Sequence, residues 1–219
     1  YKEINFITGY SKNYDWLGKK GKTLRNAMGF EYFRTFSDQY GDYLKLNLQM
    51  RISYDSIAQS SDRFSVDVHN AWGEYKLALG EYLRFGHFDP AFGLEPDLDT
   101  HGTLLQTLAM KNIGYKKDWG LAYNGLLGDF DFEFAAQTGS GMPLHRKDNS
   151  LLMTTRISTP KRNPVVWGLS LLYGRTLKAE KARTLPATDF INDSALKKRK
   201  IGLDLQMPIG LFDFKGEVA

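Results

Sequence analysis

The side chains of this sequence that could do chemistry are scattered charges rather than a compact catalytic cluster. Four histidines are present, His69, His87, His101 and His145. None has the H-x-x-x-H spacing that brings two imidazoles to one metal ion. The chain has no cysteine, which removes disulfides and thiolate metal sites. We therefore expect solvated histidines, no metal site and no cofactor.

A hydrolytic function would have to rest on one pair of residues. Ser65 lies four residues before His69, and residues four apart in a strand share a face. A lipid-acting hydrolase needs such a pair together with a polar residue that orients the base. No nucleophile motif surrounds Ser65, and neither G-x-G-x-x-G nor a P-loop occurs. We therefore expect that the protein is not an enzyme, and a lipid-acting barrel enzyme is the least favoured alternative.

Charges that alternate with apolar residues could instead act on ions or dipolar solutes. A charge beside water keeps most of its hydration, so a wet surface can carry many of them at little cost. They would either set ion selectivity or only pair with one another, and the sequence leaves both alternatives open. The residues that we expect on this surface, and so lining a pore, are Arg25, Glu31, Lys45, Arg51, Asp67, Arg84, Asp131, Glu133, Arg156 and Asp204.

The clearest element that could hold such charges is the segment 41–54, GDYLKLNLQMRISY. From Leu44 to Tyr54 apolar and polar residues alternate, and a period of two indicates a β-strand. Strands of soluble sandwiches are usually about 5–6 residues long, whereas a strand that spans a bilayer needs about 9–11. The segment favours a transmembrane barrel strand, and a long strand of a soluble β-sandwich is the alternative.

Similar alternation recurs along the chain. We expect about eleven strands, at 2–10, 24–37, 44–54, 64–76, 82–88, 119–127, 130–138, 151–159, 165–175 and 200–207, with the last after the turn at 208–210. In the strand 64–76 we expect Trp72 on the apolar face, and the phase becomes doubtful at Glu74. The segment 176–196 is polar and is expected to be irregular.

The connections between these segments alternate between long and tight. That alternation is typical of an up-and-down outer-membrane barrel, which has short turns at one end and long loops at the other. A Greek-key sandwich has no reason to place every short turn at one end. We predict an all-β fold, an up-and-down antiparallel transmembrane β-barrel, as a single domain over residues 1–219. Since single-chain bacterial barrels have an even strand number, we expect the parent protein to continue beyond Ala219 into a barrel of about 12–18 strands.

Composition agrees with this fold class and excludes others. The net charge is +4, from 29 basic and 25 acidic residues, which is too mild to indicate nucleic-acid binding. No stretch approaches the ~18 apolar residues of a membrane helix. Aromatic residues make up 14% of the chain and 21 residues are glycine, a mixture that fits barrels with aromatic girdles.

Residues 85–125 carry a resemblance to a known family. Gly86-His87-Phe88 ends a strand, Pro90-Ala91-Phe92-Gly93-Leu94-Glu95 follows, an apolar stretch runs from Leu104 to Met110, and a glycine-rich strand covers Gly120 to Gly125. This order resembles the phosphate-selective porin-like family. The resemblance implies a trimeric diffusion channel, and a loop after the fifth strand that folds into the pore. The arginine ladder of that family is not evident, so phosphate selectivity stays open.

The long break at 89–117 supports an inward loop on separate grounds. A loop of this length without clear structure is usually functional, and this one contains apolar residues such as Phe92 and Leu94 that are poorly placed in water. It also carries Glu95, Asp97 and Asp99, which we expect to face the basic side of the pore as a constriction. An external, partly helical lid is the alternative.

These features predict a porin-like channel of the bacterial outer membrane, for passive diffusion of small polar solutes or ions. Its partners would be the lipid bilayer and those solutes, with a homotrimer implied by the resemblance and no nucleic acid. The alternative from another class is a structural barrel that sheaths or anchors a partner protein in the outer membrane.

Overall fold

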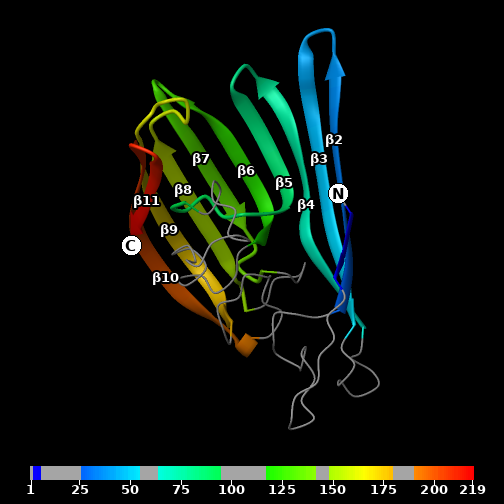
Figure 1. Cartoon of the computed structure of the whole chain (residues 1–219). Coiled ribbons are helices and arrows are strands. Elements are labelled where there is room, and N and C mark those ends of the chain that lie inside the picture. The colour runs from blue at the N-terminus through cyan, green and yellow to red at the C-terminus, as the bar shows by residue number, and fades with distance from the viewer. Residues whose placement is uncertain (1, 6–25, 55–63, 95–116, 142–147, 180–189) are drawn as a thin grey trace. The chain divides into compact units, whose positions relative to one another are not determined.

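The computed structural model of this chain describes residues 2–5, 26–54, 64–94, 117–141, 148–179 and 190–219. Within these ranges every regular element is a strand, and the strands form one sheet in the order β1-β2-β3-β4-β5-β6-β7-β8-β9-β10-β11 (Figure 1). Strands that are neighbours in the chain are neighbours in the sheet. The predicted all-β fold and the up-and-down antiparallel order are therefore confirmed.

The strands match the predicted segments closely at most of their ends. Their bounds are β1 (Lys2–Asn5), β2 (Asn26–Asp38), β3 (Gly41–Tyr54), β4 (Phe64–Ala78), β5 (Glu81–Phe88), β6 (Asp118–Leu127), β7 (Phe130–Gln137), β8 (Leu151–Ser158), β9 (Val166–Ala179), β10 (Phe190–Ile209) and β11 (Phe212–Val218).

The connections alternate in length as the sequence predicts. Residues 39–40, 79–80, 128–129 and 210–211 join strands in tight turns, and 159–165 form a slightly longer one. Gly80, Gly128 and Gly210 have φ values of 78°, 63° and 62°, and only glycine adopts such values at little cost. The connections between β1 and β2, β3 and β4, β5 and β6, β7 and β8, and β9 and β10 are longer. Tight turns thus follow every second strand.

The prediction of an irregular segment at 176–196 was wrong at 176–179 and 190–196, while residues 180–189 lie outside the described residues. β9 continues to Ala179 and β10 begins at Phe190, so much of this polar segment is paired. The register runs through Thr176↔Leu196 and Leu177↔Ala195, with shifts between Phe190 and Asn192 and between Asn192 and Ala195. Backbone N–H and C=O groups pair whatever side chain they carry. The loss of apolar alternation therefore did not mark the end of the strand. It marked a change in the surroundings of the strand's side chains.

The described residues divide into two compact units, Tyr1–Arg34 with Leu46–Ala71, and Thr35–Lys45 with Trp72–Ala219. In the first unit β1 pairs with β2 from Lys2↔Phe30 to Asn5↔Ala27. There the Asn47 amide donates to Glu31 over 2.7 Å and the Asn70 amide donates to Gln49 over 3.0 Å. The second unit holds β5–β11 and the candidate site. A single domain over residues 1–219 stays a prediction.

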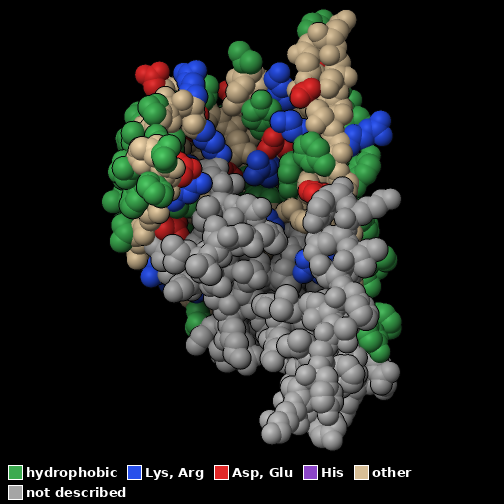
Figure 2. Space-filling view, in the orientation of Figure 1, with side chains coloured by type: hydrophobic (Ala, Val, Ile, Leu, Met, Phe, Trp, Pro, Cys, Tyr) green, Lys and Arg blue, Asp and Glu red, His purple; other side chains and the backbone are tan. Residues whose placement is uncertain are grey.

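The two faces of the sheet in the second unit have opposite chemistry. On β9, Trp167, Leu169, Leu171 and Tyr173 are exposed, whereas Gly168, Ser170 and Leu172 between them, and Gly174 and Thr176 after them, are buried. We call the face with these exposed residues the apolar face. The opposite face, which carries Glu74, Arg84, Glu133, Arg156 and Asp204, we call the polar face. Hydrophobic side chains gather along the outer edge over β9–β11 in Figure 2.

Candidate functional site

Charged side chains of opposite sign line up across the polar face. Arg84 on β5 makes two contacts to Glu74 on β4, with Nη2–Oε2 at 2.6 Å and Nε–Oε2 at 3.0 Å. Its Nη1 lies 3.9 Å from Oε1 of Glu133 on β7. Glu133 stands opposite Arg156 in the β7–β8 register, and Arg156 pairs with Asp204 on β10. We call these five residues the charge row.

The Arg156–Asp204 pair is the most enclosed part of the charge row. Nη2 donates to Oδ1 over 2.6 Å and Nε donates to Oδ2 over 3.1 Å, while Nη1 donates to Ser158 Oγ over 3.0 Å. The side chains are 6% and 0% exposed. A bidentate pair of this kind is the strongest arginine–carboxylate geometry, and buried charges persist when they are paired in this way.

A glycine lets this pair form across a strand. Arg156 and Asp204 lie on β8 and β10, with β9 between them. A Cβ at Gly168 on β9 would lie 2.6 Å from Asp204 Oδ2 and 2.8 Å from Arg156 Nη2. A strand glycine often marks such a close approach. Gly168 therefore provides the space in which the two side chains meet.

Arg84 has a different environment. Its guanidinium lies 5.3 Å from the centre of the Trp72 ring and 6.0 Å from that of Phe88, within the range of cation–π attraction. Trp72 also packs against the buried cluster of Phe88, Ala91, Ala122 and Ala135. Trp72 and Glu74 thus lie on the same face of the sheet as Arg84. The placement of Trp72 on the apolar face was wrong, because its ring lies beside Arg84 and packs against the buried cluster.

A cavity of about 380 Å³ opens beside the charge row, within the usual size range of small-molecule pockets. Its charged lining residues are three acids and three bases, so the formal charges balance. Lys45 is not one of the lining residues, but its Nζ lies 5.8 Å from the ring centre of Tyr82, which lines the cavity. The cavity is lined by Glu74, Gly80, Tyr82, Arg84, Asn124, Gly125, Leu126, Asp131, Phe132, Glu133, Arg156, Ser158 and Lys161.

The chain after β5 runs across the polar face. We call residues Asp89–Leu94 the strap. The N–H of Ala91 donates to Thr154 Oγ1 on β8 over 3.0 Å, that of Gly93 to Ser170 Oγ on β9 over 2.9 Å, and that of Leu94 to Glu217 Oε2 on β11 over 3.0 Å. The strap therefore touches strands well beyond its own neighbour in the sheet, as its path in Figure 1 shows.

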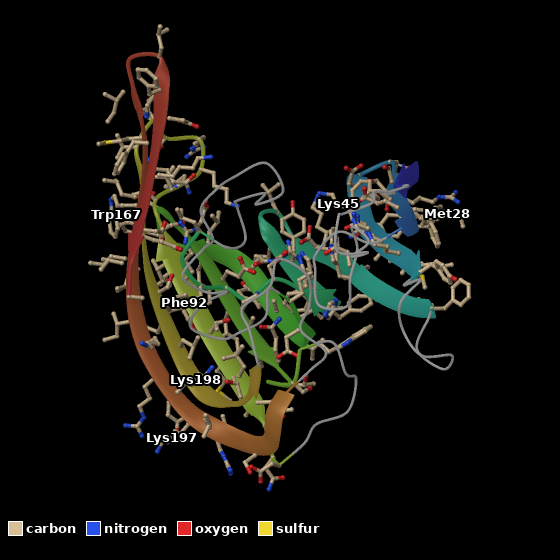
Figure 3. All side chains as sticks on the ribbon, turned by 60° about the horizontal axis from the view of Figure 1, so that its bottom comes forward. Met28, Lys45, Phe92, Trp167, Lys197 and Lys198 are labelled. Atoms are coloured by element: carbon tan, nitrogen blue, oxygen red, sulfur yellow. The ribbon has the colours of Figure 1, made fainter. Side chains whose placement is uncertain are left out.

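The strap is enclosed as well as hydrogen-bonded. Phe92 is 1% exposed, and a Cβ at Gly202 on β10 would lie 2.9 Å from its Cζ. Gly93 has φ 58° and faces Glu217 so closely that a Cβ there would clash with the carboxylate. Figure 3 places Phe92 on the opposite side of β9 and β10 from Trp167. The motif singled out in the sequence thus contains one residue, Gly93, that both backbone and space require to be glycine.

Polar contacts also hold the two ends of the β5–β6 connection. Lys117 pairs with Asp89, with Nζ–Oδ2 at 2.6 Å. Asp118, fully buried, accepts hydrogen bonds from the N–H groups of Trp119, Gly139 and Gly141 and from Thr138 Oγ1. The start and the end of the connection are therefore joined to each other and to the β7–β8 connection.

The structure brings five of the predicted pore-lining residues together. Arg84, Asp131, Glu133 and Arg156 line the cavity, and Asp204 pairs with Arg156. Lys45 belongs to the same unit, whereas Glu31 and Arg51 belong to the other. Arg25 and the loop residues Glu95, Asp97 and Asp99 lie outside the described residues, as does the side chain of Asp67. Their predicted roles stay predictions.

Sequence reasoning missed the residues that hold this arrangement in place. In the sequence, Glu74 stood out only as a charge at a position where the alternation of its strand predicts an apolar residue. That mismatch was the one signal of its role. Gly168, Thr154 and Ser170 were ordinary small residues on the polar face. Thr154 and Ser170 act through partners 63 and 77 residues away, and Gly168 acts through side chains of the two flanking strands. No local pattern reveals such partners.

In the parts of the chain that the structure describes, no group of three or more His, Asp or Glu side chains could hold a metal ion. Among the same residues no helix is long and apolar enough to cross a membrane. No family model matches the sequence, and no curated protein matches it either. The resemblance to the phosphate-selective porin-like family therefore stays a prediction.

Proposed function

We propose that this chain forms the wall of a porin-like channel in the bacterial outer membrane, through which small polar solutes and ions diffuse passively. In this proposal the sheet curves into a barrel, the apolar face contacts lipid and the polar face lines water. The observation that carries the proposal is the inverted distribution of side chains. Apolar residues are exposed on one face, and charges are enclosed on the other.

A soluble protein would not be expected to have this distribution. Ile201, Leu203 and Ile209 on β10 are 66%, 53% and 51% exposed, whereas Asp204 is 4% exposed. Large exposed apolar surfaces mark sites of contact with proteins or membranes. A barrel wall has this arrangement because lipid lies outside and water inside. The apolar face therefore needs a nonpolar environment.

The length of the apolar face fits a bilayer. Apolar residues of the apolar face run from Ile201 to Ile209 on β10, nine residues in all. A tilted strand that spans a bilayer needs about 9–11 residues. The agreement therefore favours lipid over protein as the contact of this face.

The strap and the cavity support passive diffusion of small polar solutes. The strap would narrow a water-filled lumen, because it lies across the polar face of β8, β9 and β11. The balanced charges of the cavity favour neither sign of ion strongly. Opposed acids and bases across a narrow passage orient dipolar solutes and hinder large apolar ones.

Conductance measurements test the proposal. The full chain, purified in detergent, would be added to planar lipid bilayers, and stepwise increases of current are expected. Because the chain has no cysteine, single cysteines report which face meets water. A charged, membrane-impermeant thiol reagent should change the conductance of Asp131→Cys on the polar face. It should leave that of Leu169→Cys on the apolar face unchanged.

The outcomes separate the proposal from its alternative. Insertion into vesicles without any current steps would contradict the channel and favour a structural barrel around a partner protein. Equal reaction of both cysteines would contradict the assignment of the two faces. Current steps that the reagent alters only at position 131 would support the channel.

A further inference from the structure

A group of cations stands at one end of the apolar face. Lys197 on β10 lies directly opposite Arg175 on β9, and Arg199 lies opposite Tyr173. All three cationic side chains are exposed. Figure 3 places Lys197 on the same side of β9 and β10 as Trp167, and Lys198 on the side of Phe92. Arg175, Lys197 and Arg199, which we call the cation group, therefore belong to the face that we assign to lipid.

The mutual repulsion of the cation group destabilises the sheet unless an anion offsets it. Like charges directly opposite each other on neighbouring strands destabilise a sheet. Asp148 offsets part of this, since its Oδ2 lies 3.2 Å from Arg175 Nη2 and also accepts from the N–H of Ala195 over 2.7 Å. Arg199 lies 5.4 Å from the Tyr173 ring centre. Among the described residues three cations thus stand near one acid, an arrangement that an anion would stabilise.

The surroundings of the cation group indicate what kind of anion fits. On one side lie Tyr173, Leu171, Ile201 and Leu203, which are all exposed. On the other side the β7–β8 connection meets the strands, where the N–H of Leu177 donates to the Gly139 carbonyl. The cations therefore border the apolar surface at the end where the long connections lie. This is the arrangement that an anionic amphiphile complements.

We propose that Arg175, Lys197 and Arg199 bind the phosphate headgroup of an anionic lipid, whose acyl chains lie along Leu171, Ile201 and Leu203. The inference rests on the proposed function, since it needs the apolar face to contact lipid. Side chains directly opposite on a strand pair start about 5 Å apart, and the next residue on that face follows ~7 Å along the strand. One phosphate is therefore within reach of all three.

At the other end of β10, the β10–β11 turn carries the exposed and uncharged residues Ile209, Leu211 and Phe212. Arginine binds phosphate in a bidentate manner and lysine binds it as a point charge. Along β10 we therefore expect anionic lipid to gather at the cation group rather than at this turn.

A site-specific quenching experiment tests this inference. Leu171→Cys and Trp167→Cys, each made in the full chain, would be labelled with bimane and reconstituted in phosphatidylcholine vesicles. Nitroxide-labelled phosphatidylglycerol or phosphatidylcholine is then added, and quenching is compared. At position 171 we expect phosphatidylglycerol to be preferred by about fivefold or more, from the typical contribution of a basic residue near a membrane surface. At position 167, near the opposite end, the two lipids should quench alike.

Charge variants identify the residues responsible. Lys197→Gln with Arg199→Gln, made in the Leu171→Cys chain, should abolish most of the preference and leave conductance unchanged. Arg199→Lys keeps the charge and should retain most of the preference. Lys215→Gln removes a cation from the polar face of β11 and is the matched control, which should leave the preference unaltered.

Each result bears on a different claim. Absence of quenching by either lipid at both positions would contradict the proposed function, because the apolar face would then not meet lipid. Equal quenching by both lipids at position 171 would overturn the lipid site alone. Loss of the preference on addition of inorganic phosphate, with chloride at equal ionic strength as the control, would overturn the lipid assignment in favour of a site for free phosphate.

Discussion

The polar face carries two ion-pair systems of the same chemistry in different surroundings. Arg156 and Asp204 are 6% and 0% exposed and meet through the space left by Gly168. Arg84 is 24% exposed, contacts Glu74 and, at longer range, Glu133, and lies near two aromatic rings at the cavity. The first pair is enclosed, and Arg156 also donates to Ser158. The second has several neighbours and access to solvent.

This difference separates a stabilising role from a solute-facing role. A buried charge that loses its partner cannot recover hydration, so the loss is large. A partly exposed charge that loses one partner is stabilised by water and by the remaining neighbours. We therefore expect Arg156–Asp204 to hold β8, β9 and β10 together. Under the proposed function, Arg84 would contribute to the field that a solute meets.

The largest expected effect follows from breaking the buried pair. Asp204→Ala leaves the enclosed Arg156 guanidinium without its carboxylate partner, and should lower the free energy of unfolding by about 3–5 kcal/mol. Glu74→Ala, the matched change beside the part-buried Arg84, removes two charge-assisted hydrogen bonds and should cost less, about 1.5–3 kcal/mol. Urea unfolding of the reconstituted protein measures both. Equal losses would remove the distinction between the two systems.

A smaller loss is expected when the space for the buried pair is filled. Gly168→Ala places a Cβ against both charged groups and should cost about 1–3 kcal/mol, as overpacking usually does. Gly216→Ala is the matched control, since its nearest neighbour is the Phe214 ring at 3.2 Å, which is exposed and can move. Urea unfolding again gives the values. A neutral Gly168→Ala would show that the pair can be rearranged freely.

Loosening the strap should affect current more than stability. Thr154→Val together with Ser170→Ala removes two acceptors of strap N–H groups, each worth about 1 kcal/mol. If the strap narrows the lumen, the double variant should show a larger or noisier single-channel conductance in planar bilayers. Thr155→Val, on the opposite side of β8, is the control. Unaltered current would place the narrowest part of the path elsewhere.

Changes at the solute-facing charges should alter selectivity with little effect on stability. Arg51→Gln with Arg84→Gln should shift the reversal potential in a salt gradient toward cation selectivity, because the acids of the wall would be left in excess. Arg84→Lys preserves the charge and should keep the wild-type value. A reversal potential that does not move in the double variant would show that these arginines do not face the ion path.

The smallest expected effect concerns the loop acids, which lie outside the described residues. Neutralising Glu95, Asp97 and Asp99 together should shift the reversal potential toward anions, because the basic residues would be unopposed. A triple substitution to Asn and Gln keeps the side-chain sizes. If the reversal potential were the same as in the unaltered protein, these acids would lie away from the path.

Much of the fold could be predicted because it is local. Alternation such as that of Leu44 to Tyr54 assigns side chains to faces, and the spacing of tight turns at Gly80, Gly128 and Gly210 sets the up-and-down order. The method failed where polarity changed along a strand. The predicted β9 ended too early and the predicted β10 began too late, and Trp72 was assigned to the wrong face.

The candidate site was predictable as a set of residues but not as an arrangement. Arg84, Glu133, Arg156 and Asp204 could each be placed on the polar face by their parity in a strand. Which charge meets which could not, since Arg156 and Asp204 are 48 residues apart and meet across an intervening strand. The acceptors of the strap are similarly remote.

The sequence by itself determined the strands, their order and the chemistry of the two faces, because each follows from patterns within a few neighbouring residues. Only the tertiary structure decided the pairing of Arg156 with Asp204, the position of the strap against Thr154, Ser170 and Glu217, and the place of the cation group beside Tyr173. These contacts depend on the register and curvature of whole strands. Small displacements add along each strand, so a distant pair is specified only once the sheet has formed.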